Sequence, residues 1–191
     1  MKTLFIEAYK PISQIDLVGL PSRFTLAYSI QYKPMAEKLK KQLGKRVVKN
    51  IQVLGCSKLK SDFPIVLLSD GVFHAINLAL QNSELYVLQG NKIIRFDQVN
   101  SIKAKKKAAL SRFYSSDNVG LIVSIKPGQE NLELALKTKS RLKNKKLYIF
   151  LTNNLNLSEL ENFSLPIYIN TACPGLSYDS SRIVNYEDII L

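Results

Sequence analysis

"FTLAYSIQYKP", residues 24–34, is the stretch that decides the fold. An apolar run of strand type leads through polar residues to a Lys-Pro pair, and a helical pattern follows. The same order returns at residues 119–129 as "VGLIVSIKPGQ". Setting Leu26 against Leu121 gives an offset of 121 − 26 = 95 residues. This recurrence indicates one strand-and-helix unit that is used twice.

A second pair of stretches supports the repeat. "PIVLLSDG" (64–71) parallels "PIYINTAC" (166–173), with an offset of 166 − 64 = 102 residues. The two offsets are similar, so we predict two domains, residues 1–95 and residues 96–191. The helix-like segment 97–115 is expected to begin the second domain.

Strand and helix patterns alternate along the chain. Continuous apolar runs rich in Val, Ile, Leu and Tyr are typical of strands buried on both faces of a parallel sheet. The predicted strands are residues 3–9, 24–30, 47–54, 64–70, 84–90, 118–125, 146–151 and 166–172. Helical stripes lie between them at Met35, Leu39 and Leu43, at Val99, Ile102, Ala109, Leu110 and Phe113, and at Leu132, Ala135, Leu136 and Leu142. The predicted class is α/β, with two similar βα-repeat domains and mainly parallel sheets.

Composition and length describe a globular protein. The chain has 191 residues and is 46% hydrophobic. No apolar run is long enough to span a bilayer, so a membrane partner is not expected. The N-terminal "KTLFIEAYKP" has too short an apolar core for a signal peptide. The expected location is therefore the cytoplasm.

The net charge of +12 raises the question of a nucleic-acid partner. The positive charge is concentrated in helix-like segments at residues 37–46, 103–112 and 137–146. The favoured interpretation is the solvated outer faces of helices, because no RNA-recognition signature, zinc finger or basic zipper accompanies the charge. Attraction to an acidic or RNA-bound partner is the alternative interpretation.

Candidate functional residues gather where the predicted strands end. In open α/β sheets, ligands bind at the carboxyl ends of the strands. The stretches expected there are residues 29–34, 54–56, 69–74, 124–129 and 170–175. Both cysteines, Cys56 and Cys173, and the only histidine, His74, belong to this set. This convergence is the strongest functional signal in the sequence.

The two cysteines cannot form a disulfide framework. Cys56 follows Gly55 after an apolar run, and Cys173 precedes Pro174. One interpretation is two small buried apolar side chains, and the other is two metal or redox ligands. Their separation of 173 − 56 = 117 residues matches no short zinc or ferredoxin motif. A shared metal would have to be assembled by the fold.

"KPGQ" (126–129) is predicted to be a short turn that opens a helix. Gly128 would expose backbone amides and Lys126 would add positive charge, which favours an anion. The alternative is an ordinary turn between a strand and a helix.

The stretch around His74 is predicted to open a helix, with Asp70 and Gly71 as its cap. A lone histidine is more often a hydrogen-bonded structural residue than a catalytic one. The sequence contains no Ser/His/Asp or Cys/His arrangement, no Walker loop and no GxGxxG fingerprint.

Four collinear stretches resemble the archaeal diphthamide synthase family, over nearly the whole chain. They are "VLGC" (53–56), "LLSDGVFHAINLAL" (67–80), "VSIKPGQENLELA" (123–135) and "IYINTACPGLSYD" (167–179). The resemblance implies a non-classical radical S-adenosylmethionine enzyme that acts on translation elongation factor 2. A 3-amino-3-carboxypropyl group would move from S-adenosylmethionine to a histidine carbon, in the first step of diphthamide formation.

The resemblance also implies a fold and a cofactor. Members of this family have three similar α/β domains, each of which gives one cysteine to a [4Fe–4S] cluster, and they work as dimers. By resemblance, Cys56 is the ligand of the middle domain and Cys173 the ligand of the last domain. The residues implied in cofactor binding are Gly71, His74, Lys126, Gly128, Gln129, Asn170 and Thr171, and Asp179 belongs to the frame around the last cysteine. No catalytic side chain is assigned.

By this resemblance, the sequence begins where the family's first domain ends, so the first domain and its cysteine are not expected in it. Three thiolates leave one iron open to bind the methionine end of the cofactor, and two thiolates alone cannot reproduce that site. Three hypotheses follow. A first-domain chain completes the synthase, or this chain is an accessory partner of a full-length synthase chain, or it is a binding module that has lost the cluster. A homodimer is a further possible assembly. Whichever hypothesis holds, the thiols of Cys56 and Cys173 are expected to face one common cleft, with residues 71–74 and 126–129 nearby.

Overall fold

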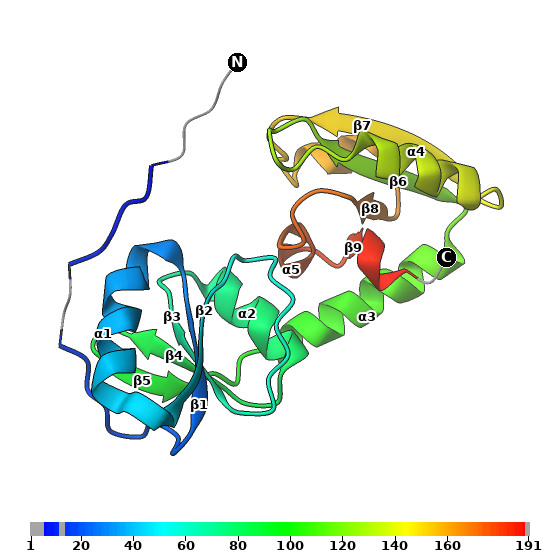
Figure 1. The fold of residues 1–191 in the computed structure, drawn as a ribbon. Coiled ribbons are helices and arrows are strands. Elements are labelled where there is room, and N and C mark those ends of the chain that lie inside the picture. The colour runs from blue at the N-terminus through cyan, green and yellow to red at the C-terminus, as the bar shows by residue number, and fades with distance from the viewer. Residues whose placement is uncertain (1–5, 12–13, 190–191) are drawn as a thin grey trace. The chain divides into compact units, whose positions relative to one another are not determined.

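The computed structural model describes residues 6–11 and 14–189. The chain divides into two compact units, Met1–Val99 and Asn100–Leu191, each built on its own sheet (Figure 1). The sequence had placed the division after residue 95. Helix α3 (Asn100–Ser115) is the first element of the second unit.

The first unit is a five-stranded sheet in the order β2-β1-β3-β4-β5. The first four strands in the chain are parallel, and β5 pairs with β4 as an antiparallel hairpin. The strands are β1 (Phe24–Tyr28), β2 (Val47–Gln52), β3 (Ile65–Leu68), β4 (Leu85–Gln89) and β5 (Lys92–Arg95). The connecting helices are η1 (Ile30–Tyr32), α1 (Lys33–Leu43), η2 (Gly44–Arg46) and α2 (Val72–Gln81).

Each face of this sheet is covered by one helix. On one face, Met35 and Leu39 of α1 pack with Leu26 and other buried residues of the sheet. On the other face, Ala75 and Leu78 of α2 pack with buried residues that include Ile65 and Leu67. The inner strands β1 and β3 are buried along their whole length and mostly apolar, because both faces of the sheet are covered there.

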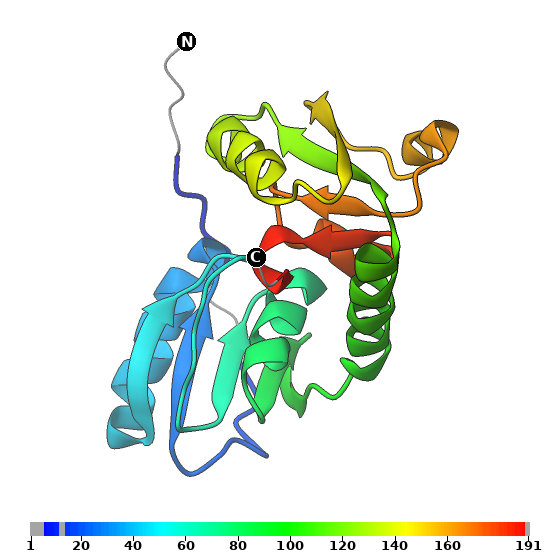
Figure 2. The same cartoon turned by 90° about the vertical axis from the view of Figure 1, so that its right-hand side faces the viewer.

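The second unit has a four-stranded parallel sheet in the order β7-β6-β8-β9, and its strands lie side by side in Figures 1 and 2. They are β6 (Asn118–Ser124), β7 (Lys146–Thr152), β8 (Tyr168–Asn170) and β9 (Ile183–Asn185). The other helices are α4 (Leu132–Arg141), η3 (Glu159–Phe163), α5 (Leu176–Asp179) and η4 (Tyr186–Asp188). Residues of α3 and α4 cover one face, and residues of η3 and α5 cover the other.

The two sheets share one topology, which confirms the predicted pair of similar βα-repeat units. In both, the first strand lies between the second and the third, and the fourth follows the third. Leu26 and Leu121 are both fully buried in that first strand. The offset of 102 residues between the second pair of stretches is wrong by one residue. Ile65 pairs with Thr25 and Tyr168 pairs with Gly120, and these two partners are 120 − 25 = 95 residues apart, as are Leu26 and Leu121. The offset is therefore 168 − 65 = 103 residues, since a slip of one residue would exchange the two faces.

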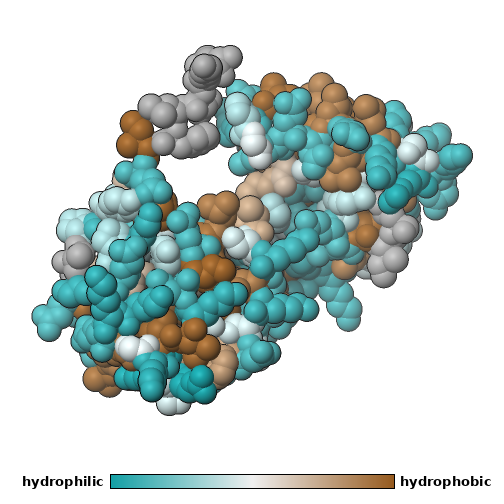
Figure 3. All heavy atoms as spheres, in the orientation of Figure 1, coloured by the Kyte–Doolittle hydropathy of each residue, from teal (hydrophilic) through white to brown (hydrophobic). Residues whose placement is uncertain are grey.

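Most of the predicted strands are confirmed, with one exception and two omissions. The predicted strand 3–9 is wrong over residues 6–9, which are extended but pair with no strand, and residues 3–5 lie outside the described residues. Strands β5 and β9 were missed because each carries a run of only two apolar residues. Figure 3 shows mostly hydrophilic residues on the visible face, with smaller hydrophobic groups among them. Within the described residues, no helix has the length and apolar character needed to cross a membrane.

Candidate functional site

The candidate site of the second unit lies at the carboxyl end of its sheet, where β6, β7 and β8 end. A pocket of about 300 Å³ opens there. Its polar lining comes from three loops and includes Ser124, Lys126, Gln129, Asn153, Asn154 and Cys173. The structure thus brings Lys126 and Gln129 of the "KPGQ" stretch together with Cys173, as expected for ligands at strand ends.

The "KPGQ" stretch forms a tight turn. The Gln129 amide donates a hydrogen bond to the Lys126 carbonyl at 3.0 Å, and Gly128 has a φ of +78°. Pro at the second position and Gly at the third are typical of a type II turn. A Cβ at Gly128 would meet no atom within 4 Å, so the backbone conformation alone requires glycine here.

The prediction that this turn opens a helix is wrong. Helix α4 begins at Leu132, and its N-cap is Asn131. Glu130 still pairs with Ser124 through an isolated parallel bridge, so extended backbone separates the turn from the helix. The Gly128 amide is therefore not part of a helix N-terminus, and an anion here would meet Lys126 without the helix dipole.

Asn170 and Thr171 are buried beneath the Cys173 loop. The Asn170 side-chain amide donates to the carbonyl of Cys173 at 2.8 Å, and its oxygen accepts from the Ala172 amide at 3.0 Å. The Thr171 hydroxyl donates to the Ile122 carbonyl at 2.9 Å. Neither residue lines the pocket, and both hold the loop that carries the half-buried Cys173. Asp179 is exposed at the end of α5.

Cys56 lies exposed on a turn after β2 in the first unit. The Ser57 amide donates to the Leu54 carbonyl at 3.1 Å, and the Leu54 amide donates to the Ser57 hydroxyl oxygen at 2.8 Å. Gly55 lies against the ring of Phe73, where an added Cβ would come within 1.7 Å of a ring carbon. The "LGC" and "GVFH" stretches are therefore in direct contact, and glycine is required by this close approach.

His74 is half-buried in the first turn of α2. Its Nδ1 lies 3.3 Å from the Ser69 hydroxyl oxygen. Burial lowers the pKa of His74, so the imidazole is predominantly neutral at neutral pH. Gly71 is the N-cap of the same helix, and it lines a separate pocket of about 270 Å³ with Ser69 and Asp70.

Asp70 does not cap α2 as the sequence suggested. Its carboxylate accepts a hydrogen bond from the Tyr32 hydroxyl and forms an ion pair with the Lys10 ammonium at 2.5 Å. The bond from Lys10 and then that from Tyr32 lower the pKa of Asp70. Burial and the bond to Asp70 raise the pKa of Tyr32. This cluster ties the N-terminal segment to the ends of β1 and β3.

The donor set of each unit fits one thiolate ligand and no complete metal site. Cys56 and Cys173 are free thiols at the ends of strands. Among the described residues, no group of three or more His, Cys, Asp or Glu side chains could hold a metal ion. Soft thiolates are the ligands that iron–sulfur clusters require. Each unit therefore fits a cluster as a contributor of a single ligand.

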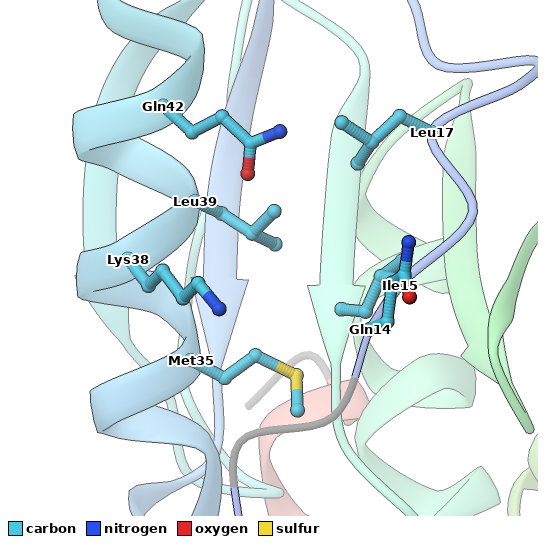
Figure 4. Close-up of a pocket in the computed structure, with 7 residues that line it drawn as sticks. All are labelled: Gln14, Ile15, Leu17, Met35, Lys38, Leu39 and Gln42. Carbon is cyan, nitrogen blue, oxygen red and sulfur yellow. The ribbon is translucent and has the colours of Figure 1, made fainter.

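A larger pocket, of about 420 Å³, lies between α1 and residues 14–17 (Figure 4). Figure 4 shows Met35, Leu39 and Gln42 of α1 facing Ile15 and Leu17 across it. No predicted site residue lines this pocket, and it lies beside a helix and away from the strand-end loops. It is therefore not the candidate site.

Two groups of site residues were missed from the sequence. Asn153 and Asn154 line the pocket directly after β7, and the strand-end rule applied to the predicted strand 146–151 would have found them. Asn185 pairs with Asn170 across β8 and β9 and bonds to it at 2.8 Å. It was missed because the short strand that carries it was missed.

Residues 7–191 match the protein family described as "Putative diphthamide synthesis protein". The 2-(3-amino-3-carboxypropyl)histidine synthase of Pyrococcus horikoshii is 28% identical over 136 residues, which cover 67% of this chain and 40% of that protein. The chain thus spans well under half the length of this relative.

Solved structures share the fold. The crystal structure of Dph2 from Pyrococcus horikoshii has a TM-score of 0.74 at 22% identity, over 88% of this chain and 56% of that chain. A second crystal structure of Dph2 from the same organism, with a 4Fe-4S cluster, gives the same values. Since the family match extends over nearly the whole sequence, the chain belongs to the diphthamide synthesis protein family.

Proposed function

We propose that this chain is one part of a diphthamide synthase. It takes part in transfer of a 3-amino-3-carboxypropyl group from S-adenosylmethionine to a histidine of translation elongation factor 2. The observation that carries the proposal is the pocket of the second unit, where Cys173 lies with Lys126 and Gln129 at the strand ends. The family match and the name of the relative supply the reaction class.

In this proposal the two cysteines are thiolate ligands of one [4Fe–4S] cluster. Cys56 corresponds to the ligand of a middle-type domain and Cys173 to that of a last-type domain. When bound, the cluster would supply the electron for radical chemistry on S-adenosylmethionine.

The polar residues of the pocket are proposed to hold the cofactor's amino-acid end. The Lys126 ammonium is suited to a carboxylate, and the amides of Gln129, Asn153 and Asn154 can donate and accept hydrogen bonds. Gly128 shapes the turn that presents Lys126 and Gln129. Gly71 and His74 are proposed to contact the cofactor from the middle-type domain. Asn170 and Thr171 are proposed to act indirectly, by holding the loop that carries Cys173.

The third thiolate is proposed to come from a partner chain that carries a first-type domain. Two thiolates do not complete the three-cysteine site that this cofactor needs. Iron should be counted after anaerobic iron–sulfur reconstitution of this chain, alone and with a first-domain chain. We expect low iron alone, and higher iron together with S-adenosylmethionine-dependent modification of elongation factor 2 in the mixture. The variants Cys56→Ser and Cys173→Ser should each abolish the gain. Cleavage of S-adenosylmethionine by this chain alone would contradict the proposal.

A second candidate is a non-catalytic subunit that supports a full-length synthase chain. It is favoured by the lack of a complete metal-ligand group among the described residues. In this case, adding the chain should raise the activity of a complete synthase, and the two serine variants should do so equally well. Loss of the stimulation in both variants would favour the first candidate.

A further inference from the structure

The loop of Cys56 is held by side-chain amides of α2. The carbonyl of Ser57, the residue after the cysteine, accepts from the Asn77 side-chain amide at 2.8 Å. It also accepts from the Gln81 side-chain amide at 3.1 Å. Gln81 is one helical turn beyond Asn77 and donates to its side-chain oxygen at 3.1 Å. Two donors therefore converge on one carbonyl that no strand pairs.

The loop of Cys173 is held in the same way. The Pro174 carbonyl, again from the residue after the cysteine, accepts from the Asn185 side-chain amide at 3.1 Å. The Cys173 carbonyl accepts from Asn170, which also donates to the Asn185 side-chain oxygen. Asn185 donates a further bond to the Ser177 hydroxyl oxygen at 2.8 Å. Asn170 and Asn185 are 2% and 7% exposed, so these bonds are shielded from water.

We infer that these amides are positioning residues for the two thiols, an inference that rests on the proposed ligand role of the cysteines. Carbonyls in loops past the end of a sheet lack ladder partners and need donors from elsewhere. A side-chain amide supplies two N–H groups without burying a charge. A ligand must be held to within about 0.5 Å for a rigid metal group, and holding the carbonyl beside each cysteine restrains the backbone from which its thiol projects.

The two units supply their amides from unrelated elements. Asn77 and Gln81 come from a helix, whereas Asn170 and Asn185 come from the ends of two strands. Because the topology is repeated and the source of the amides is not, the shared feature is the carbonyl that they hold. Amides that only stabilised the repeated fold would be expected at equivalent positions of the two units. Their different positions therefore favour a role in placing the thiols.

The test measures the thiols in the metal-free chain and then with iron. In Asn185→Ala, iodoacetamide should alkylate Cys173 about fivefold faster, because the loop opens locally, while Cys56 keeps its rate. Ser177→Ala removes a second donor to the Pro174 carbonyl, at 2.9 Å, and should act in the same direction by less. It serves as the second variant should Asn185→Ala fold poorly.

The first unit offers a matched control at Asn82, the C-cap of the same helix. Asn77→Ala should speed hydrogen exchange of the Ser57 amide and leave Cys173 unchanged. Asn82 holds the Leu59 carbonyl at 2.8 Å, beyond the Cys56 turn. Asn82→Ala should lower the melting temperature without changing exchange at Ser57. Equal effects of Asn77→Ala and Asn82→Ala on Ser57 would overturn the inference.

Iron retention separates the failure of this inference from failure of the proposed function. With a first-domain chain, Asn185→Ala and Asn77→Ala should retain less iron after reconstitution than Asn82→Ala. Unchanged alkylation, exchange and iron retention in both variants would overturn the inference. If the wild-type mixture holds no iron but the thiol measurements change as expected, the proposed function fails and the positioning of the thiols stands.

Discussion

The same position of the repeat carries a carboxylate in the first unit and a thiol in the second. Ile65 and Tyr168 are equivalent by strand register, and counting five residues on from each leads to Asp70 and Cys173. Asp70 is held by the Tyr32 hydroxyl and the Lys10 ammonium. Cys173 is a free thiol on a polar pocket. The repeated backbone therefore sets where a loop lies, and the loop residues set its chemistry.

The cysteines themselves follow different strands of the repeat. Cys56 comes after β2, an edge strand of its sheet, and Cys173 comes after β8, an inner strand of its sheet. After β7, the counterpart of β2, the second unit has Asn153 and Asn154 in the pocket. The thiols were therefore not placed by duplication of one cysteine-bearing loop.

The covering of the sheets differs as well. The third strand of the first unit leads to the ten-residue helix α2, whereas that of the second leads to the four-residue helix α5. The longer helix provides the amides that hold the Cys56 turn. The shorter helix cannot, and the second unit uses Asn170 and Asn185 at the strand ends instead.

The largest effect on stability is expected from Gly120→Ala in the second unit. An added Cβ would lie 2.1 Å from the ring of Tyr168, which is fully buried and donates its hydroxyl to the Leu160 carbonyl at 2.6 Å. The ring has no room to move, so overpacking should lower the free energy of unfolding by about 2–3 kcal/mol. Urea denaturation would measure the change. A loss below about 0.5 kcal/mol, the usual range of surface substitutions, would show that Tyr168 can shift.

Gly55→Ala in the first unit should have a smaller effect. The predicted contact is with the ring of Phe73, which is only half-buried and can turn outward. We expect a loss of about 1–2 kcal/mol, because overpacking is relieved by this movement. The double variant Gly55→Ala with Phe73→Leu should recover part of the loss. If the double variant loses more unfolding free energy than the two single variants together, the contact with the Phe73 ring is not the cause of the loss in Gly55→Ala.

The strands of the fold could be predicted from the sequence, but the close contacts of the two glycines could not. The apolar runs predict β1, β3 and β6 well because both faces of each strand are buried, and the repeat of "FTLAYSI" in "VGLIVSI" predicts the shared topology. The sequence does not reveal that Gly55 and Gly120 each face an aromatic ring. Such contacts join residues far apart in the chain, and no local pattern records them.

The candidate site was predictable in part for the same reason. The strand-end rule places Lys126, Gln129 and Cys173 in one group, since all follow parallel strands of one sheet. It gives no direction for a side chain. The family resemblance implies Asn170 in cofactor binding, and in the structure its polar atoms bond to the loop of Cys173. The helix start was misplaced because Pro127 and Gly128 favour a turn that continues into extended backbone.

The acid sensitivity of the first unit should depend on His74. Burial lowers its pKa from 6.5, so the unfolded chain binds the proton more readily than the folded chain. Stability should therefore fall as pH decreases through 6.5. In His74→Asn this contribution is absent, and the free energy of unfolding should depend less on pH in that range. Parallel pH profiles for the two proteins, measured by urea denaturation, would contradict the assigned burial.

The smallest effect is expected from Asp70→Asn, at the position equivalent to Cys173. Hydrogen bonds from Lys10 and Tyr32 lower the pKa of Asp70 below 3.8, so its contribution is present above that pH and is lost as pH falls through the folded-state value. The pair is exposed, and exposed ion pairs contribute little. Asp70→Asn keeps an acceptor for Tyr32 and loses the attraction of Lys10. Its melting temperature should be slightly lower than that of the wild type at neutral pH, and the difference should vanish in acid.

Faster proteolysis within residues 6–11 should accompany the lower melting temperature of Asp70→Asn, because Lys10 ties that segment to the sheet end. An unchanged cleavage rate would mean that the bond from the Lys10 amide to the Gln31 carbonyl, at 2.8 Å, holds the segment without the ion pair.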